Sequence, residues 1–321
     1  MEKVKNFLES DKVNVRKKIK GKRAKSKLKR ALIPIEDIIL FGNNLKMMVA
    51  DKINEGIYDR LSVDNTSGRF HSPLTQLKKG LRPFVKYNGE TLYGIDIVNS
   101  QPLFALIILD FNLFMDNKIY EIIAHYNKTH HEMMKLDKQT SFTNPFSTML
   151  FNLIKTAHTK RDVLNFKRNV AGGYFYENFS AELSLKGLLP IEISNDQIAI
   201  RKFAKEAVFT AFFSRTKDCV WNNHIKAFSK CYPTVYKIFT FIKHGANNHP
   251  ALACLLQRFE SKLVLHETCV EINKKFPHIP IFTVHDSIVT TSKYRAIVEQ
   301  IFKEHLAKCL GINPPLKIEA W

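Results

Sequence analysis

Residues 92–102 read Leu-Tyr-Gly-Ile-Asp-Ile-Val-Asn-Ser-Gln-Pro, an apolar run interrupted by one carboxylate. The apolar residues predict a buried strand that carries Asp96 near its end. Asn99 and Ser100 are typical N-caps and Pro102 suits a first helical turn, so we expect a helix to follow. A buried carboxylate without a partner is costly, so Asp96 needs a cation, either an Arg or Lys side chain or a metal ion.

A second carboxylate occupies a similar place near the other end of the chain. Residues 279–291 read Ile-Pro-Ile-Phe-Thr-Val-His-Asp-Ser-Ile-Val-Thr-Thr, which predicts a β-hairpin with Asp286 at its turn. Two carboxylates at neighbouring strand tips form the oxygen-lined kind of site that Mg²⁺ prefers when it also takes phosphate oxygens. Two such ions about 3.5–4 Å apart activate a hydroxyl and stabilise a leaving pyrophosphate, which is the chemistry of nucleotidyl transfer.

The composition indicates a folded protein with a polyanionic partner. The 321 residues are 45% hydrophobic, enough for a large core in one domain or in two to three subdomains. The net charge of +19 favours nucleic acid over membrane. We find no apolar run of transmembrane length, no secretory signal and no CxxC pair among the five cysteines. We therefore expect a cytoplasmic protein with reduced thiols, without a zinc site or a membrane partner.

Residues 1–30 form a strongly basic arm, in which ten of the fifteen residues from Arg16 to Arg30 are Lys or Arg. The pattern predicts contact with phosphate backbones that does not read sequence. The residues that we assign to this contact are Lys17, Lys18, Lys22 and Arg23. The alternative is a solvated tail that only adds solubility.

The helix expected over residues 198–215 carries a distinctive stripe. Its members, at i, i+4, i+8 and i+12, are Arg201, Lys205, Phe209 and Phe213. This spacing places all four on one side of the helix. A stripe that begins cationic and ends aromatic suits a nucleoside triphosphate, with its phosphates at the cations and its base over the rings. The alternative is an ordinary amphipathic helix whose Phe side chains lie in the core and whose cations are solvated.

The remaining pattern gives the order of elements. Further helices are expected at 161–170, 257–271 and 294–310, the last one closed by Gly311, and a final strand at 314–319. The strand–helix unit and the hairpin are thus separated by many helices. We predict an α+β fold whose small antiparallel sheet is interrupted by a long helical insertion.

Four segments, taken in order, resemble motifs of the family A DNA polymerases and of the related single-subunit phage-type RNA polymerases. Residues 66–72, Thr-Ser-Gly-Arg-Phe-His-Ser, with Leu77 beyond them, are similar to the family's T-G-R-L-S-S…N-L-Q segment. Asp96 with Ser100 and Gln101 resembles motif A, in which a strand ends in a metal-binding Asp followed by Ser-Gln.

The other two motifs lie further along the chain. The stripe from Arg201 to Phe213 is similar to motif B, R-x3-K-x3-F-x3-Y-G, on the helix that grips the incoming nucleotide. His285-Asp286 resembles motif C, and Gln257 occupies the place of a Gln that touches the primer–template minor groove. The resemblance covers residues 62–321. It implies a right-hand polymerase palm on a small antiparallel sheet, with a large helical fingers insertion and a reduced thumb.

The resemblance also implies a division of the chain. The parts are a basic arm at 1–30, a thumb-like helical segment at 31–61, palm at 62–110, helical fingers at 111–270 and the rest of the palm at 271–321. This length leaves no room for a proofreading 3′–5′ exonuclease domain.

The resemblance assigns a role to each residue of these motifs. Asp96 and Asp286 would hold two Mg²⁺ ions, with Mn²⁺ as a substitute. Arg201 and Lys205 would neutralise charge on the β- and γ-phosphates, and Lys205 would also donate a proton to pyrophosphate. Both sets of residues are present in the order that the family requires.

Positioning roles follow in the same way. Phe209 and Phe213 would stack on and position the nucleoside. Arg69 and Gln257 would hold the primer terminus, and His285 would orient it.

The sequence also departs from the family pattern. Ser287 follows the motif C Asp, as in the RNA enzymes, where the DNA enzymes have Glu. By counting, Gln101 falls where the DNA enzymes keep a Glu that excludes ribose, whereas alignment on Ser-Gln places Leu103 there. Phe213 lacks the hydroxyl that the RNA enzymes direct at the 2′-OH, and Ser214 replaces the usual Gly.

We therefore expect a minimal DNA-directed DNA polymerase that binds primer–template nucleic acid and nucleoside triphosphates. DNA is the favoured template, and an RNA template and accessory replication proteins stay open. The expected context is a bacterium, a phage or a mobile element. One alternative is a single-subunit RNA polymerase or primase-like enzyme, and another is a catalytically degenerate homologue that only binds nucleic acid. Retention of Asp96, Asp286, Arg201 and Lys205 favours an enzyme, because a pure binder needs no buried acids.

Overall fold

The computed structural model describes residues 49–50, 52–56, 61–114, 145–215, 222–244 and 250–321. The basic arm 1–30, with Lys17, Lys18, Lys22 and Arg23, and most of the segment 31–61 lie outside the described residues. None of the described helices combines the length and the apolar character that a membrane span requires.

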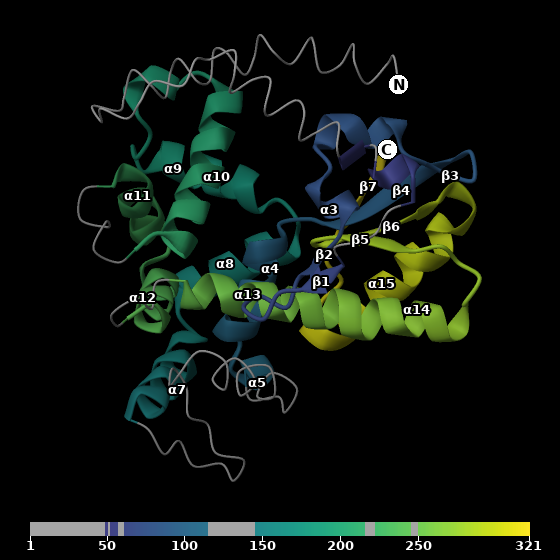
Figure 1. The fold of residues 1–321 in the computed structure, drawn as a ribbon. Coiled ribbons are helices and arrows are strands. Elements are labelled where there is room, and N and C mark those ends of the chain that lie inside the picture. The colour runs from purple at the N-terminus through teal and green to yellow at the C-terminus, as the bar shows by residue number, and fades with distance from the viewer. Residues whose placement is uncertain (1–48, 51, 57–60, 115–144, 216–221, 245–249) are drawn as a thin grey trace, which may run out of the picture.

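An antiparallel sheet brings together strands from two distant parts of the sequence, residues 86–97 and 282–320 (Figure 1). Its central strand β4 (Glu90–Ile97) pairs with β6 (Ser287–Thr291) along one edge and with β7 (Leu316–Ala320) along the other. The short β3 (Lys86–Tyr87) pairs with the start of β4, and β5 (Phe282–Val284) pairs with β6. The strand, the hairpin and the last strand expected from the sequence are thus confirmed, and β3 is an addition.

The two faces of this sheet have different partners because successive side chains of a strand point in opposite directions. Ile95, Ile97 and Ile288 belong to the large core that the helices share. On the opposite face, Leu92 and Trp321 belong to a small apolar cluster beside the strand tips. Asp96 lies between Ile95 and Ile97 on β4 and points the opposite way, so it lies on this second face.

A long helical insertion separates β4 from β5, as the sequence predicted (Figure 1). Its helices are α4 (Ser100–Leu109), α5 (Phe111–Phe114), α7 (Pro145–Ala157), α8 (Arg161–Ala171), α9 (Phe175–Leu185), α10 (Gln197–Phe213), α11 (Asn223–Cys231) and α12 (Pro233–Ile242). Tyr232 lies at the centre of their core, with its ring centroid 5.3 Å from that of Phe166 and 5.4 Å from that of Phe228. The contact with Phe166 is edge-to-face, and aromatic pairs of this kind stabilise a core beyond the area that the rings bury.

One long helix connects the insertion to the sheet. It begins as α13 (Ala251–Ser261), continues through a π-helical segment (Lys262–Cys269) and ends as α14 (Val270–Lys275). Figure 1 shows it running from the neighbourhood of α12 to that of α15 (Arg295–Leu310). Gly311 ends α15 in the left-handed conformation at φ 65°, as a C-cap glycine does.

The segment before β4 packs on the second face of the sheet. A small hairpin of β1 (Ser62–Val63) and β2 (Phe70–His71) leads into α3 (Pro73–Gln76) and a 3₁₀ turn (Lys79–Phe84). Leu74 of α3 joins the apolar cluster that contains Leu92. This packing places the Thr-Ser-Gly-Arg segment beside the strand tips.

The start of α4 differs from the expected capping pattern. Asn99 occupies the N-cap position, but its backbone is left-handed at φ 56° and its side chain makes no capping hydrogen bond. Its amide donates instead to the carbonyl of Gly173 at 3.0 Å, which ties α4 to the loop before α9. Asn tolerates this conformation better than most residues. The predicted N-cap position is therefore confirmed, whereas the capping hydrogen bond expected of its side chain is absent.

Candidate active site

The two carboxylates singled out in the sequence lie on a strand and at the turn that leads into its neighbour. Asp96 of β4 stands directly opposite Ser287 of β6, the residue that follows Asp286. His285 and Asp286 form the turn between β5 and β6, and His285 adopts a left-handed backbone at φ 57°. Burial raises the pKa of Asp286, and the nearby negative charge of Asp96 raises it further. Such repulsion between carboxylates is what a divalent cation relieves.

The described residues fit a metal site completed by a substrate. Lys317 of β7 stands opposite Asp96, yet its ammonium contacts Glu319 at 2.6 Å. Within the described ranges, no three His, Cys, Asp or Glu side chains gather into a ready-made metal site. A pair of carboxylates suits Mg²⁺ in the mode that completes its coordination with water and phosphate oxygens.

Glu260 of α13 is a third buried acid, which the sequence analysis missed. Its side chain is 1% exposed. Its donors are Arg69 Nε at 2.9 Å, Arg69 Nη2 at 2.7 Å, Ser100 Oγ at 3.0 Å and Gln101 Nε2 at 2.8 Å. Burial raises the pKa of Glu260 to about 7 against the opposing charge of Arg69, and Asp286 adds to the rise. The available signal was an acid three residues after Gln257 on a helix whose first six residues are apolar.

Glu260 also fixes the orientation of Gln101. The carboxylate accepts from the amide nitrogen, so the amide oxygen must point the other way. That oxygen is buried and has no hydrogen-bond partner among the described residues. The hydroxyl of Ser100 donates to Glu260, and Ser100 also lowers the pKa of Asp286.

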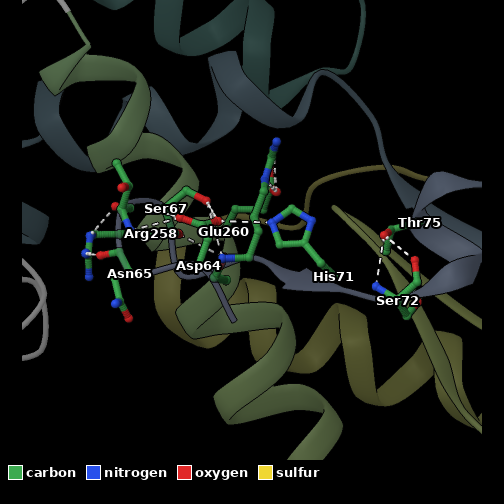
Figure 2. A network of polar contacts seen from close by, with 11 residues as sticks. Asp64, Asn65, Ser67, His71, Ser72, Thr75, Arg258 and Glu260 are labelled. Carbon is green, nitrogen blue, oxygen red and sulfur yellow. Dashed lines mark hydrogen bonds and ion pairs between the residues drawn. The ribbon is translucent and has the colours of Figure 1, made fainter. Parts of the chain in front are cut away.

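The loop before Arg69 is fastened to α13 by hydrogen bonds to its backbone carbonyls (Figure 2). Arg258 donates to the carbonyl of Thr66 at 2.8 Å and also to that of Asn65. Ser261 donates to the carbonyl of Ser67 at 3.2 Å. Residues one turn apart on α13 thus hold the loop from which Arg69 projects toward Glu260.

Asp64 stabilises this loop by accepting hydrogen bonds from residues within it. Its carboxylate accepts from the backbone N–H of Ser67 at 2.6 Å and of Thr66 at 2.9 Å, and also from the Ser67 hydroxyl. Burial alone raises the pKa of Asp64, but these hydrogen bonds outweigh it and lower the value to about 2. Gly68 follows at φ 70°, a conformation that favours glycine.

The residues predicted to hold a primer terminus fall in one region. Partial burial lowers the pKa of His285, and the charges of Arg69, His71 and Arg82 lower it further, so these groups are close together. Gln257 is half-buried on α13, three residues before Glu260. The structure therefore brings His285 and Arg69 together and places Gln257 on the helix that supports Arg69.

The predicted stripe lies on α10, where Arg201, Lys205 and Phe209 are exposed and Phe213 is partly buried. The Lys205 ammonium lies 5.8 Å from the centre of the Phe209 ring, and the Phe209 and Phe213 ring centroids are 5.5 Å apart. Arg201 pairs with Glu177 of α9 at 2.7 Å. Phe209 is 37% exposed, whereas Phe212 is fully buried. Phe213 is partly buried and packs against the large core, so the alternative of an ordinary amphipathic helix fits Phe213 better than the exposed Phe209.

Both ends of α10 are fixed. At its start the Asp196 side chain accepts from the backbone N–H of Ile198 at 2.9 Å and of Ala199 at 3.1 Å, as an N-cap. At its end the buried ammonium of Lys243 donates to the carbonyls of Ala211 at 2.6 Å and Ser214 at 3.3 Å. A cation at this end also suits the helix dipole.

No protein-family model matches this sequence, and no curated protein matches it. Among solved structures, the chain is similar to the POL domain of Pol1 from M. smegmatis in complex with DNA primer-template and dNTP. The TM-score is 0.47 and the sequence identity is 10%. The match covers 89% of this chain and 52% of that one, so the chain spans about half the length of the structure that it matches.

Proposed function

We propose that this protein is a template-directed nucleotidyltransferase, and specifically a DNA-directed DNA polymerase with a two-metal mechanism. One observation carries the proposal: Asp96 on β4 stands opposite Ser287, Asp286 directly precedes that residue at the turn into β6, and the charge of Asp96 raises the pKa of Asp286. The cationic and aromatic stripe on α10 and the Arg69 cluster beside the turn support it. A protein that only binds nucleic acid gains nothing from placing two acids together.

In this proposal Asp96 and Asp286 hold Mg²⁺, which would lower the pKa of a primer 3′-hydroxyl and stabilise the leaving pyrophosphate. Arg201 and Lys205 bind phosphate oxygens, and Lys205 delivers a proton to the pyrophosphate. Phe209 offers an exposed ring against which a nucleoside stacks. The binding energy at these side chains is most useful for the rate where charge develops in the transition state.

Primer positioning is assigned to the cluster around the turn. Arg69 and Gln257 contact the primer terminus, and His285 orients it. Glu260 acts through Arg69, because it accepts two hydrogen bonds from that guanidinium and so fixes its direction. We call Glu260 a positioning residue for this reason.

RNA synthesis is the second candidate function, and Gln101 is the observation that favours it. Its buried amide oxygen is an acceptor without a donor among the described residues. A ribose hydroxyl would donate a hydrogen bond to this neutral oxygen. The Glu that the DNA enzymes keep at this place would instead present a charged carboxylate. Extension assays with deoxyribonucleotides and with ribonucleotides distinguish the two candidates directly.

The deciding experiment is primer extension with Mg²⁺, with Mn²⁺ and with chelator, on DNA and RNA templates. We expect Asp96→Asn and Asp286→Asn to reduce turnover by on the order of 10³-fold or more, since each removes a metal ligand. Primer–template affinity should stay near that of the wild type. Glu90→Gln, at the exposed far end of β4, is the matched control and should be fully active.

Two results would contradict the proposal. Near-normal extension by either Asp variant would show that Asp96 and Asp286 do not together hold the catalytic metal ions. A wild-type chain that binds primer–template but extends it under no condition would instead identify a nucleic-acid-binding homologue without catalysis.

A further inference from the structure

Lys317 is a cation on the site face of the sheet to which no role has been assigned. It stands directly opposite Asp96 in the β4–β7 pair. Directly opposite residues of an antiparallel pair project from the same face, with neighbouring Cβ atoms. Asp96 is thus flanked by Ser287 on one strand and by Lys317 on the other. The Lys317 side chain is 61% exposed, so its ammonium is accessible from solution.

Lys317 forms an exposed ion pair with Glu319. Glu319, two residues along β7, accepts from Lys317 at 2.6 Å and from Lys79 at 2.8 Å. These hydrogen bonds lower the pKa of Glu319 to about 2, so it is ionised at neutral pH. One carboxylate between two lysines leaves an excess positive charge. Exposed ion pairs are readily exchanged because they contribute little to stability, so Lys317 is free to turn toward an incoming anion.

Lys317 interacts electrostatically with both the carboxylate site and α10. The hydrogen bond to Glu319 is the main cause that raises the pKa of Lys317, and Asp96 raises it as well. Arg201 of α10 has the opposite effect, as a neighbouring positive charge must. Lys317 therefore lies within electrostatic reach of both a proposed metal ligand and the first cation of the α10 stripe.

We propose that Lys317 is a further triphosphate-binding residue, which contacts the phosphate oxygens of a nucleotide from strand β7. The inference rests on the proposed function and deepens it. Arg201 and Lys205 approach the phosphates from one side, and Lys317 supplies a point charge from the strand that carries no other site residue. A lysine suits this role because a flexible ammonium adapts to phosphate oxygens without a fixed geometry.

Lys79 offers a matched control. It binds the same carboxylate, its side chain is 71% exposed, and it stands on the 3₁₀ turn before β3 rather than opposite Asp96. We expect Lys317→Met to raise the nucleotide KM about tenfold, the size of one charge-assisted contact. Primer–template affinity should be unchanged. Lys79→Met should stay within about twofold of the wild type, and Lys317→Arg should recover most of the affinity.

A binding measurement separates this inference from the proposed function. Calorimetric titration with Mg²⁺ and inorganic tripolyphosphate needs no primer extension, and Lys317→Met should weaken this binding while Lys79→Met should not. If the wild type extends no primer but shows this difference, the inference stands and the polymerase assignment falls. If the wild type extends primers while Lys317→Met and Lys317→Gln keep its nucleotide KM and tripolyphosphate affinity, the inference is overturned. Equal losses in the Lys317 and Lys79 variants would also overturn it, because they would reflect net charge alone.

Discussion

At the scale of single residues, the surroundings of Asp96 are crowded, and small side chains make room for it. A Cβ on Gly94 would lie 3.0 Å from Trp321 Nε1, 3.2 Å from Ser287 Oγ and 3.7 Å from Asp96 Oδ1. A larger residue at position 94 would therefore displace the side chains that border the carboxylate. The glycine in an otherwise apolar strand was the sequence signal for this close approach.

The α10 stripe yields a residue-scale prediction that separates binding from packing. Lys205→Ala should mainly lower kcat, with a smaller change in KM, because charge builds on the leaving pyrophosphate in the transition state. Lys202→Ala is the matched control, since Lys202 lies on the same helix outside the stripe and pairs with Glu206 at 4.0 Å. Steady-state kinetics on both variants provide the measurement. A fully active Lys205→Ala enzyme would remove the phosphate role of the stripe.

Phe209 and Phe212 give the corresponding test for the aromatic half. Phe209→Ala should raise the nucleotide KM and change the tolerance of sugar analogues. Because Phe209 is 37% exposed, the variant should lose only about 1 kcal/mol of unfolding free energy. Phe212 is fully buried, so Phe212→Ala should lose about 3–5 kcal/mol. Thermal melts and steady-state kinetics on both variants provide the measurement. Comparable destabilisation by both variants would mean that Phe209 is a packing residue.

At the scale of elements, three segments meet on one carboxylate. Glu260 on α13 receives hydrogen bonds from Arg69 in the loop after β1 and from Ser100 and Gln101 in the first turn of α4. The individual elements were predictable, because apolar periodicity marks α13 and the strand before α4. Their meeting point was not, since Arg69 and Glu260 are 191 residues apart in sequence. Local pattern carries no information on such a pairing.

This junction predicts how stability depends on pH. The pKa of Glu260 is about 7 in the folded state against an ordinary value of 4.5, so the folded state binds the proton more tightly. Its contribution to stability is therefore largest below pH 4.5 and is lost as the pH rises toward 7 and just above. The full change is about 3 kcal/mol. Urea unfolding between pH 5 and 8, without divalent cations, should show this slope in the wild type.

Glu260→Gln should flatten that part of the slope, because the amide does not titrate. Glu192→Gln, on an exposed 3₁₀ turn, is the control and should leave the slope as it is. Histidine titrations are common to all three proteins and cancel in the comparison. An unchanged slope in Glu260→Gln would show that another group causes the pH dependence.

At the scale of the whole molecule, the sequence predicted the sheet better than the details of the site. The strand at Asp96, the hairpin at Asp286 and the final strand followed from alternation and turn residues, and the structure pairs them in one sheet. Glu260 and Lys317 were missed for a physical reason. An acid becomes notable only when tertiary packing buries it, and a surface lysine only when strand register places it opposite Asp96.

The last prediction concerns the charge of the whole chain, which is +19. Ten of the fifteen residues from Arg16 to Arg30 are basic, so deletion of residues 1–30 should weaken binding to all nucleic-acid sequences alike. Each lost phosphate contact lowers the slope of log affinity against log salt by about 0.9, and loss of the four contacts assigned to Lys17, Lys18, Lys22 and Arg23 would lower it by roughly 4.

Binding measured between low and high salt tests this directly, with a variant whose first 30 residues are shuffled as the matched control. The shuffled arm keeps its charge and should keep the slope, because phosphate contacts of this kind do not depend on sequence. Catalysis at saturating primer–template should survive the deletion, since Asp96, Asp286 and the α10 stripe all lie outside the arm. An unchanged affinity and an unchanged salt slope after deletion would show that the arm is a solvated tail.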